Sequence, residues 1–353
     1  MFQPFRKVRE KIPNPLGRET MRAVQMTAVG GPEMLQLREV SDPQIQSKTE
    51  TLVRLRAAGI NPVDAKQRGR GPWYPGALPV ILGIDGAGIV EEVGQDVKSV
   101  KRGDEVFFAH GGFGKLPGNY AEFTVVEERF LAHKPSAVSF VEAAAATSSC
   151  ITAWECLFYL GQLQRGQHVL IQAGAGGVGH IAVQLAREKG ARIATTVNSE
   201  QKAQLVRECG ADRVIFYEEE DFVEQTLEWT TGNGVDLTID LVGKETFFKS
   251  FSATRFYGTI VTLLGPDPQY ANWQEARLRN QQVKFYLMLT PMFYDLVDHQ
   301  VRQTKILQEC ARLMTEGKLR IHVSKTFPLE EAAHAHRLIE TGDTIGKVVL
   351  EIP

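Results

Sequence analysis

The sequence has few cysteines, no long apolar run and no excess of charge of one sign. The four cysteines, Cys150, Cys156, Cys209 and Cys310, form no C-x-x-C pair, so we expect reduced thiols in a cytoplasmic protein. No stretch of ~18 apolar residues is present, which argues against an integral membrane protein. Lys and Arg number 40 against 42 Asp and Glu, a net charge of −2, and this balance argues against nucleic acid as a partner.

The 353 residues are enough for about two domains whose cores need no disulfide or metal. Residues 1–20 differ from the rest, because basic side chains stand among prolines before any strand-like alternation begins. This stretch has no apolar signal segment, and Glu10 and Glu19 are unlike an organelle transit peptide. We therefore expect residues 1–20 to form an N-terminal extension.

The remaining chain has two different patterns. Residues 21–140 read as short strands separated by Gly, Pro and Asp, which predicts a compact β-barrel-like domain. From about residue 140, helical segments alternate with strands, as in the strand–helix–strand unit at residues 168–197. This alternation predicts a doubly wound parallel sheet with right-handed crossovers, and we expect the β-like tail after residue 320 to return to the first domain.

A glycine-rich loop joins the strand at residues 168–172 to the helix predicted at 178–189. Its pattern is G-x-G-x-x-G, in which Gly174 permits a tight turn, Gly176 lets a pyrophosphate approach the backbone and Gly179 allows close helix–strand packing. The helix N-terminus adds free N–H groups for the anion. The alternative is a glycine-rich turn without a ligand. The loop residues predicted to bind a dinucleotide are Gly174, Gly176, Gly177, Val178 and Gly179.

The end of the next strand indicates which dinucleotide is used. An acidic residue there would hold the ribose 2′-OH of NAD and repel the 2′-phosphate of NADP. This strand ends with the neutral Asn198 and Ser199, and Lys202 follows one helical turn later with a positive charge. The pattern favours NADP(H), although Glu200 would take the acid's place if the register were shifted by two residues.

The order of these features resembles the medium-chain dehydrogenase/reductase superfamily from residue 21 to nearly the end of the chain. The resemblance implies an α/β fold, with a GroES-like β-barrel catalytic domain and a doubly wound parallel-sheet Rossmann domain. It implies a catalytic domain of residues 21–147 and 291–353 and an NADP-binding domain of residues 148–290. The segments that carry the resemblance are residues 58–64, 79–94, 103–106 and 346–349.

The zinc-dependent branch of that family would carry Cys where Asn61 stands, His where Ile84 stands and a third ligand near Ser148. Ile cannot ligate, and Asn and Ser are poor Zn²⁺ ligands beside Cys and His. We therefore expect no catalytic zinc. The eight histidines are scattered, and we interpret them as surface or core residues rather than ligands.

What remains resembles the zinc-independent quinone oxidoreductase branch, in which Asn61 and Asp64 match polar residues beside the nicotinamide. The alternatives are that Asp64 only caps a neighbouring N–H and that Asn61 only makes an Asx-turn before Pro62. Tyr74 is a candidate proton donor at the edge of the cleft. The alternative is that Tyr74 and Trp73 are ordinary packing residues. The resemblance further assigns cofactor contacts to Thr152, Tyr217, Val242, Gly243 and Lys347.

Without a metal at the developing alkoxide, electrophilic acceptors suit this site best. The sequence thus predicts an enzyme that transfers hydride from NADPH to a quinone or an α,β-unsaturated carbonyl. Two alternatives remain: an NADPH-binding sensor or partner protein with little turnover, and a reductase of enoyl thioesters or alkenals. Residues 282–289 are hydrophobic and strand-like, and we expect a homodimer through this strand, or else a buried strand in a monomer.

Overall fold

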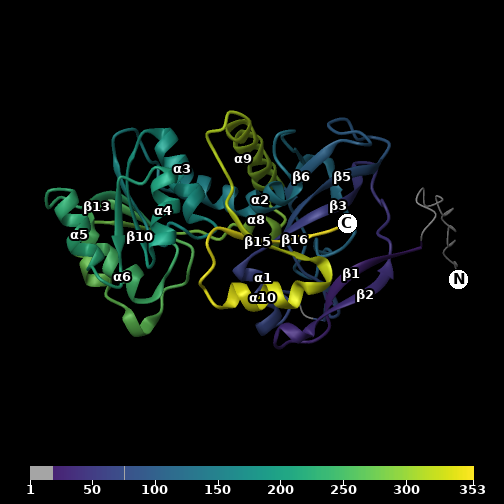
Figure 1. Cartoon of the computed structure of the whole chain (residues 1–353), viewed down its shortest axis with the longest axis horizontal. Helices are drawn as coiled ribbons and strands as arrows, with labels where there is room; N and C mark the ends of the chain where they lie inside the picture. Colours follow the sequence, from purple (N-terminus) through teal and green to yellow (C-terminus); the bar gives the residue numbers. More distant parts are fainter. Residues whose placement is uncertain (1–18, 75) are drawn as a thin grey trace, which may run out of the picture.

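The computed structural model describes residues 19–74 and 76–353, which form two lobes joined by central helices (Figure 1). The predicted extension, residues 1–20, lies almost wholly outside the described residues. The N-terminal lobe is built on antiparallel strands, and the other lobe on a parallel sheet. The predicted α/β fold class, a GroES-like domain with a Rossmann domain, is confirmed.

The N-terminal lobe contains a three-stranded sheet of order β2-β1-β4 and a larger sheet of order β15-β16-β3-β5-β6-β8, in which β7 also pairs with β3. The C-terminal strands β15 and β16 complete this larger sheet, because β16 runs antiparallel to β3. Alternating apolar side chains such as Leu55, Val90 and Phe108 fill its core. The strands are β1 (Thr20–Met26), β2 (Leu35–Ser41), β3 (Glu50–Ile60), β4 (Val80–Ile81), β5 (Asp85–Val93), β6 (Glu105–Ala109), β7 (Phe123–Glu127), β8 (Ala132–His133), β15 (Val323–Pro328) and β16 (Lys347–Glu351).

The Rossmann lobe has six parallel strands in the order β11-β10-β9-β12-β13-β14. The strand order reverses beside β9, so ligands are expected at the carboxyl ends of β9, β10 and β12. Helix α3 packs against α4, and α5 packs against α6. The elements are β9 (His168–Ile171), α3 (Gly179–Lys189), β10 (Arg192–Val197), α4 (Glu200–Cys209), β11 (Arg213–Phe216), α5 (Phe222–Trp229), β12 (Val235–Asp240), α6 (Lys244–Ala253), β13 (Thr254–Thr262), α7 (Trp273–Leu278) and β14 (Gln282–Phe285).

Helix α2 (Phe140–Trp154) lies between the lobes, where it packs against β3 and β5 on one side and α3 on the other. Ser139 and Glu142 begin it with a capping box. Its fully buried alanines, Ala143 to Ala146, allow this close approach. The predicted boundary at residues 147 and 148 falls inside this helix, which both lobes share. Other helices are α1 (Pro62–Arg70), α8 (Thr290–Phe293), α9 (Val297–Thr315), α10 (Ala332–Glu340), the π-helix Glu155–Leu160 and the 3₁₀ helices Pro32–Met34, Glu128–Phe130, Pro268–Tyr270 and Leu329–Glu331.

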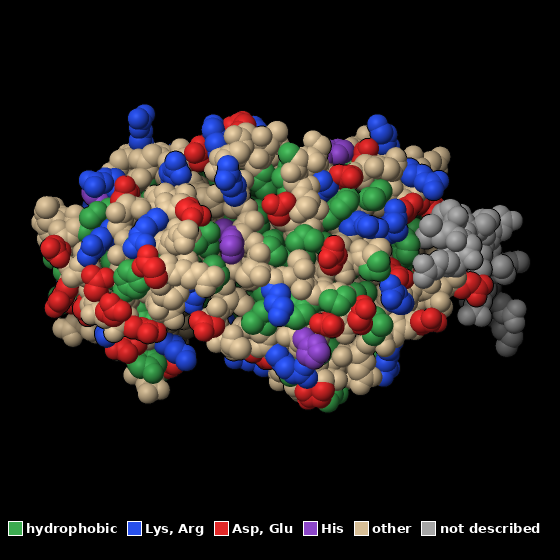
Figure 2. All heavy atoms as spheres, in the orientation of Figure 1, with side chains coloured by type: hydrophobic (Ala, Val, Ile, Leu, Met, Phe, Trp, Pro, Cys, Tyr) green, Lys and Arg blue, Asp and Glu red, His purple; other side chains and the backbone are tan. Residues whose placement is uncertain are grey.

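The surface carries charges of both signs. Figure 2 shows acidic side chains gathered at the end of the Rossmann lobe, around α5 and α6, and a mixture of both signs over the rest of this face. Among residues 19–74 and 76–353, no helix is long and apolar enough to cross a membrane.

Candidate active site

The glycine-rich loop lies between β9 and α3, and its glycines face different surroundings. A Cβ added at Gly174 would overlap Thr195 Oγ1, and one at Gly179 would overlap the carbonyl of Ala173. A Cβ at Gly176 would meet only Ala173 O, at 3.3 Å. Two of the three glycines are therefore required by packing, whereas the backbone at Gly176 is open to approach. This arrangement fits the pyrophosphate of a dinucleotide at the N-terminus of α3.

The C-terminal tail holds this loop from the other lobe. Gly346 donates its N–H to Ala175 O at 2.7 Å and forms a bridge with Gly176. The stem of Lys347 lies next to Gly177, where an added Cβ would be 2.9 Å from Lys347 Cδ. The loop is thus fixed to the strand that carries Lys347 into the other lobe.

His180 provides a second connection between the loop and the tail. Its Nδ1 lies 2.8 Å from Gly176 O, and the backbone N–H of His322 donates to its Nε2 at 3.2 Å. Since a carbonyl only accepts, Nδ1 carries the proton. Burial lowers the pKa of His180 to about 4, so the ring is neutral. Sequence reasoning classed His180 as a surface or core residue, and its position directly after Gly179 was the signal available.

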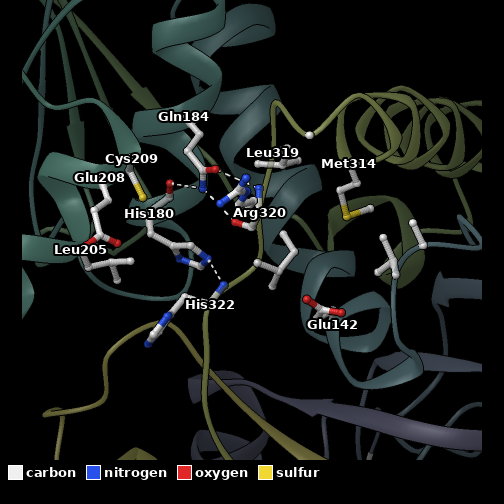
Figure 3. A pocket seen from close by; sticks show the side chains of 14 residues that line it. Glu142, His180, Gln184, Leu205, Glu208, Cys209, Met314, Leu319, Arg320 and His322 are labelled. Atoms are coloured by element: carbon white, nitrogen blue, oxygen red, sulfur yellow. Dashed lines mark hydrogen bonds between the residues drawn. The ribbon is translucent and has the colours of Figure 1, made fainter.

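A cavity of about 460 Å³ lies beside this connection (Figure 3). Figure 3 shows Gln184 bridging α3 to the backbone of Arg320, to which its amide donates at 2.9 Å. Glu142 and Met314 line the same cavity. None of the site residues predicted from sequence borders it. The cavity therefore borders the phosphate loop only through His180.

The residues predicted beside the nicotinamide meet in a buried cluster where β3 ends. Asn61 is the N-cap of α1, and its backbone N–H donates to Asp64 Oδ2 at 2.9 Å. Asn61 Nδ2 donates to Asp85 Oδ2 at 2.9 Å. The Ser148 hydroxyl lies 2.8 Å from Asp85 Oδ2 and 3.2 Å from Asn61 Oδ1, so these two acceptors share its single hydrogen. Asn61 and Asp64 therefore cap the start of α1, and Asn61 also contacts Asp85 and Ser148. Both residues have a structural role in addition to any role in catalysis.

Lys347 brings a positive charge into this cluster. Its Nζ lies 2.6 Å from Asn61 Oδ1 and 3.3 Å from Asp85 Oδ2, and the side chain is 4% exposed. The resemblance placed Lys347 at the pyrophosphate; here its stem passes the loop, and its ammonium contacts Asn61 and Asp85. Sequence reasoning did not single out Asp85, although it lies in the quoted segment 79–94.

The three positions that would hold zinc in related enzymes are close together. Asn61 and Ser148 are hydrogen bonded to one another, and Ile84 is buried directly before Asp85. Within the part of the chain that the structure describes, no group of three His, Cys, Asp or Glu side chains is arranged to hold a metal. An amide, a hydroxyl and an alkyl side chain beside an ammonium do not fit Zn²⁺.

Asp64 belongs to a second buried chain of polar groups. Tyr120 donates its hydroxyl to Asp64 Oδ2 at 3.1 Å and lies 3.2 Å from His336 Nε2. Burial, with a further contribution from the charge of Asp85, raises the pKa of Asp64 to about 7. Burial and the guanidinium of Arg68 lower the pKa of His336 to about 3, so that ring is neutral. Asp64 therefore changes charge near neutral pH.

The other predicted residues come from different elements of the two lobes. Tyr74 is half-buried and donates its hydroxyl to Phe293 O at 3.3 Å, while Trp73 stacks on the Phe293 ring with centroids 4.3 Å apart. Thr152 is buried on α2. Val242 and Gly243 follow β12, and their N–H groups donate to Asp240 Oδ1 at 3.1 and 2.9 Å.

The predicted adenosine-binding residues lie at the ends of β10 and β11. Ser199 caps α4 by accepting the N–H of Lys202 at 3.3 Å. The ammonium of Lys202 donates to Asn198 Oδ1 at 2.8 Å and to Asp343 Oδ1 at 3.0 Å. Tyr217, directly after β11, is 49% exposed, and its backbone N–H donates to Val197 O at 3.1 Å at the end of β10. Asp343 was not predicted, because it comes from the distant loop before β16.

Comparison with known proteins agrees with this geometry. Residues 47–136 match the family model of the alcohol dehydrogenase GroES-like domain, and residues 209–350 match that of the zinc-binding dehydrogenases. The chain is 33% identical over 329 residues to quinone oxidoreductase of Pseudomonas aeruginosa, covering 93% of this chain and 99% of that protein. It is also 33% identical to quinone oxidoreductase 1 of Escherichia coli, covering 91% and 96%.

Solved structures show the same relationship. An alcohol dehydrogenase superfamily protein from Novosphingobium aromaticivorans matches with a TM-score of 0.87 and 34% identity, covering 95% of this chain and all of that one. Escherichia coli quinone oxidoreductase, solved with NADPH, matches with a TM-score of 0.83 and 31% identity, covering 94% and 99%. The chain therefore belongs to the medium-chain dehydrogenase/reductase superfamily. Within it, the chain is a member of the quinone oxidoreductase-like branch, as the sequence predicted.

Proposed function

We propose that this enzyme transfers hydride from NADPH to a quinone or an α,β-unsaturated carbonyl compound without a catalytic zinc ion. Its membership of the quinone oxidoreductases supports the reaction class, and the Escherichia coli relative solved with NADPH supports the cofactor. The open backbone at Gly176 and the ammonium of Lys202 are suited to the pyrophosphate and the 2′-phosphate.

The observation that carries the proposal is the contact between Lys347 and Asn61 at 2.6 Å. The ammonium of Lys347 lies among the positions that hold zinc in other enzymes of the superfamily, and Asp85 balances its charge. A metal-dependent reduction of simple ketones needs a Lewis acid that polarises the carbonyl oxygen. Conjugated acceptors spread the incoming charge over the whole π-system, so hydrogen-bond donors suffice.

Asn61 is the donor that we assign to the acceptor oxygen. Its Nδ2 carries two hydrogens, and one of them is donated to Asp85. Its Oδ1 accepts from both Lys347 and Ser148, which fixes the orientation of the amide and polarises it toward donation. NADPH, when bound, supplies the hydride, and the protein supplies orientation and exclusion of water.

The cofactor would be held along the carboxyl ends of the parallel strands. The phosphate loop would hold the pyrophosphate, and Asn198, Ser199, Lys202 and Tyr217 would surround the adenosine phosphate. Thr152, Val242 and Gly243 would border the nicotinamide. Tyr74 and Trp73 would form the outer wall of the acceptor site, where aromatic rings suit a flat molecule.

Stopped-flow absorbance at 340 nm tests this proposal. The chelator-treated protein is mixed with NADPH and either a simple quinone or a short enone. Rapid oxidation by one acceptor, faster than with NADH and unchanged by chelation, is the expected result and ranks the acceptors. If NADPH binds and neither acceptor is reduced, the sensor function replaces the proposal. If enoyl thioesters or alkenals are reduced and quinones are not, the enzyme is a double-bond reductase rather than a quinone reductase.

We also propose a homodimer through residues 282–289. The structure has β14 at residues 282–285 as an edge strand of the Rossmann sheet, and Phe285 and Leu287 are exposed. An apolar edge strand is stabilised by pairing with a second copy. Because all four cysteines are buried free thiols, we propose a cytoplasmic location. Light scattering and fractionation test these two proposals.

A further inference from the structure

The predicted 2′-phosphate site carries acidic side chains beside its lysine. Lys202, the cation expected to bind the phosphate, is 13% exposed and forms an ion pair with Asp343, which is 76% exposed. Asp343 lies in the loop between α10 and β16, which turns toward the Rossmann lobe in Figure 1. The lysine thus already has a carboxylate partner from the other lobe.

A second acid borders the same place. Glu218 accepts a hydrogen bond from Asn198 Nδ2 at 3.4 Å and directly follows Tyr217. Burial raises the pKa of Tyr217, and the charges of Glu218 and Asp343 raise it further. Both acids therefore face the side chain expected beside the adenosine. The ammonium of Lys202 is therefore accompanied by two carboxylates, those of Asp343 and Glu218.

These charges act differently on the two dinucleotides. A 2′-phosphate brings a charge of about −1.5 to −2 and is repelled by both carboxylates. Lys202 has three N–H donors, of which Asn198 and Asp343 each take one, so one remains for a phosphate. The neutral ribose 2′-OH of NADH meets no repulsion and can donate to a carboxylate.

We propose that Asp343 is a cofactor-specificity residue, which pairs with Lys202 and limits the preference of this enzyme for NADPH over NADH. The inference rests on the proposed function, because it uses the adenosine end of the same cofactor site. Removing the charge of Asp343 frees Lys202 for the phosphate and removes one repulsive partner. Asp343→Asn increases the preference for the 2′-phosphate by roughly three- to tenfold, as expected for a charge pair near the surface.

The experiment measures binding rather than turnover. Isothermal titration calorimetry compares adenosine 2′,5′-bisphosphate with adenosine 5′-monophosphate on the wild type, Asp343→Asn and Glu218→Gln. Glu245→Gln is the matched control, since it neutralises an exposed acid that pairs with Lys249 on α6. Lys202→Met, alone and combined with Asp343→Asn, tests whether the effect passes through Lys202.

We expect Asp343→Asn to tighten binding of the bisphosphate three- to tenfold and to change that of the monophosphate less than twofold. Glu218→Gln gives a smaller increase and Glu245→Gln gives none. Asp343→Asn gives little gain when it is added to Lys202→Met. If the ratio of the two affinities is unchanged in Asp343→Asn, or if Glu245→Gln gives the same gain, Asp343 does not determine specificity. The proposed cofactor site would not be affected by either result. If neither probe binds to the wild type, the proposed cofactor site fails as well.

Discussion

The two ends of the candidate cofactor site are built in opposite ways. At the nicotinamide end, Asp85 and Lys347 are buried, and they contact one another, Asn61 at the N-cap of α1 or Ser148 on α2. At the adenosine end, Lys202 and Asp343 form an ion pair on the surface. A buried ion pair cannot lose one partner without a large cost, whereas a surface pair can. Changes at the first end should thus affect folding and chemistry together, and changes at the second only selectivity.

Replacement of Asp85 tests this difference most strongly. Asp85→Ala leaves the buried ammonium of Lys347 without its carboxylate, and we expect a loss of about 3–5 kcal/mol in the free energy of unfolding. Asp343→Ala, the matched change at the exposed end, should leave stability almost unchanged. Urea denaturation followed by tryptophan fluorescence measures both. Asp85→Asn keeps the shape and one acceptor, so its loss should be smaller. Equal losses in the two alanine variants would disprove the comparison.

Two glycines of the phosphate loop, Gly179 and Gly176, are expected to serve packing and cofactor binding respectively. Gly179→Ala should lower stability by roughly 1–3 kcal/mol, because its Cβ would overlap the Ala173 carbonyl. Gly176→Ala should cost less stability than Gly179→Ala, because its Cβ would meet only Ala173 O, at 3.3 Å, and it should weaken NADPH binding. Thermal melts with and without NADPH measure both effects. A Gly176→Ala variant that melts early but binds normally would contradict the proposed position of the pyrophosphate.

The pH dependence of stability tests the burial of Asp64. Its pKa of about 7 lies above the ordinary value, so the folded protein holds this proton more tightly than the unfolded chain. The resulting stabilisation is complete below about pH 4 and is lost as the pH rises through 7. The slope is at most about 1.4 kcal/mol per pH unit.

Asp64→Asn should therefore gain stability relative to the wild type as the pH rises from about 4 to about 7, and this gain should level off above pH 7, as measured by urea denaturation. Tyr120→Phe removes a donor to Asp64 Oδ2, so the wild-type transition should move to higher pH. The buried neutral His180 and His336 act in the opposite direction, since their lowered pKa values cost stability as the pH falls below about 6.5. A constant difference between Asp64→Asn and the wild type over this range would show that Asp64 does not titrate there.

Features within one continuous segment could be predicted from the sequence, whereas contacts between distant segments could not. The unit from β9 to α3 is contiguous, so its pattern predicted the loop, and α3 begins at Gly179, one residue after the predicted start. The strand predicted at residues 282–289 pairs only as far as Phe285. The contact between Asn61 and Lys347 joins positions 286 residues apart, and no local pattern encodes it.

The sequence patterns did not identify two charged residues, Asp85 and Asp343, whose partners come from distant parts of the chain. Asp85 reads as one more residue of a strand until the fold places Lys347 beside it. Asp343 reads as a polar loop residue until α10 brings its loop to Lys202. Sequence patterns therefore predicted the elements and the cofactor class, whereas the partners that tune the charges depend on contacts between the lobes.

The smallest effect is expected at Tyr74, which is half-buried beside Phe293. Its hydroxyl is already donated to Phe293 O, so it has no proton directed at an acceptor molecule. Tyr74→Phe loses one hydrogen bond worth about 1 kcal/mol, and we expect kcat/KM with a quinone to fall less than about fivefold. Tyr74→Ala also removes the aromatic wall and should raise KM more than it lowers kcat. A loss above 100-fold in Tyr74→Phe would instead make Tyr74 the proton donor, and the chemistry would then depend on this half-buried side chain rather than on the buried Asn61.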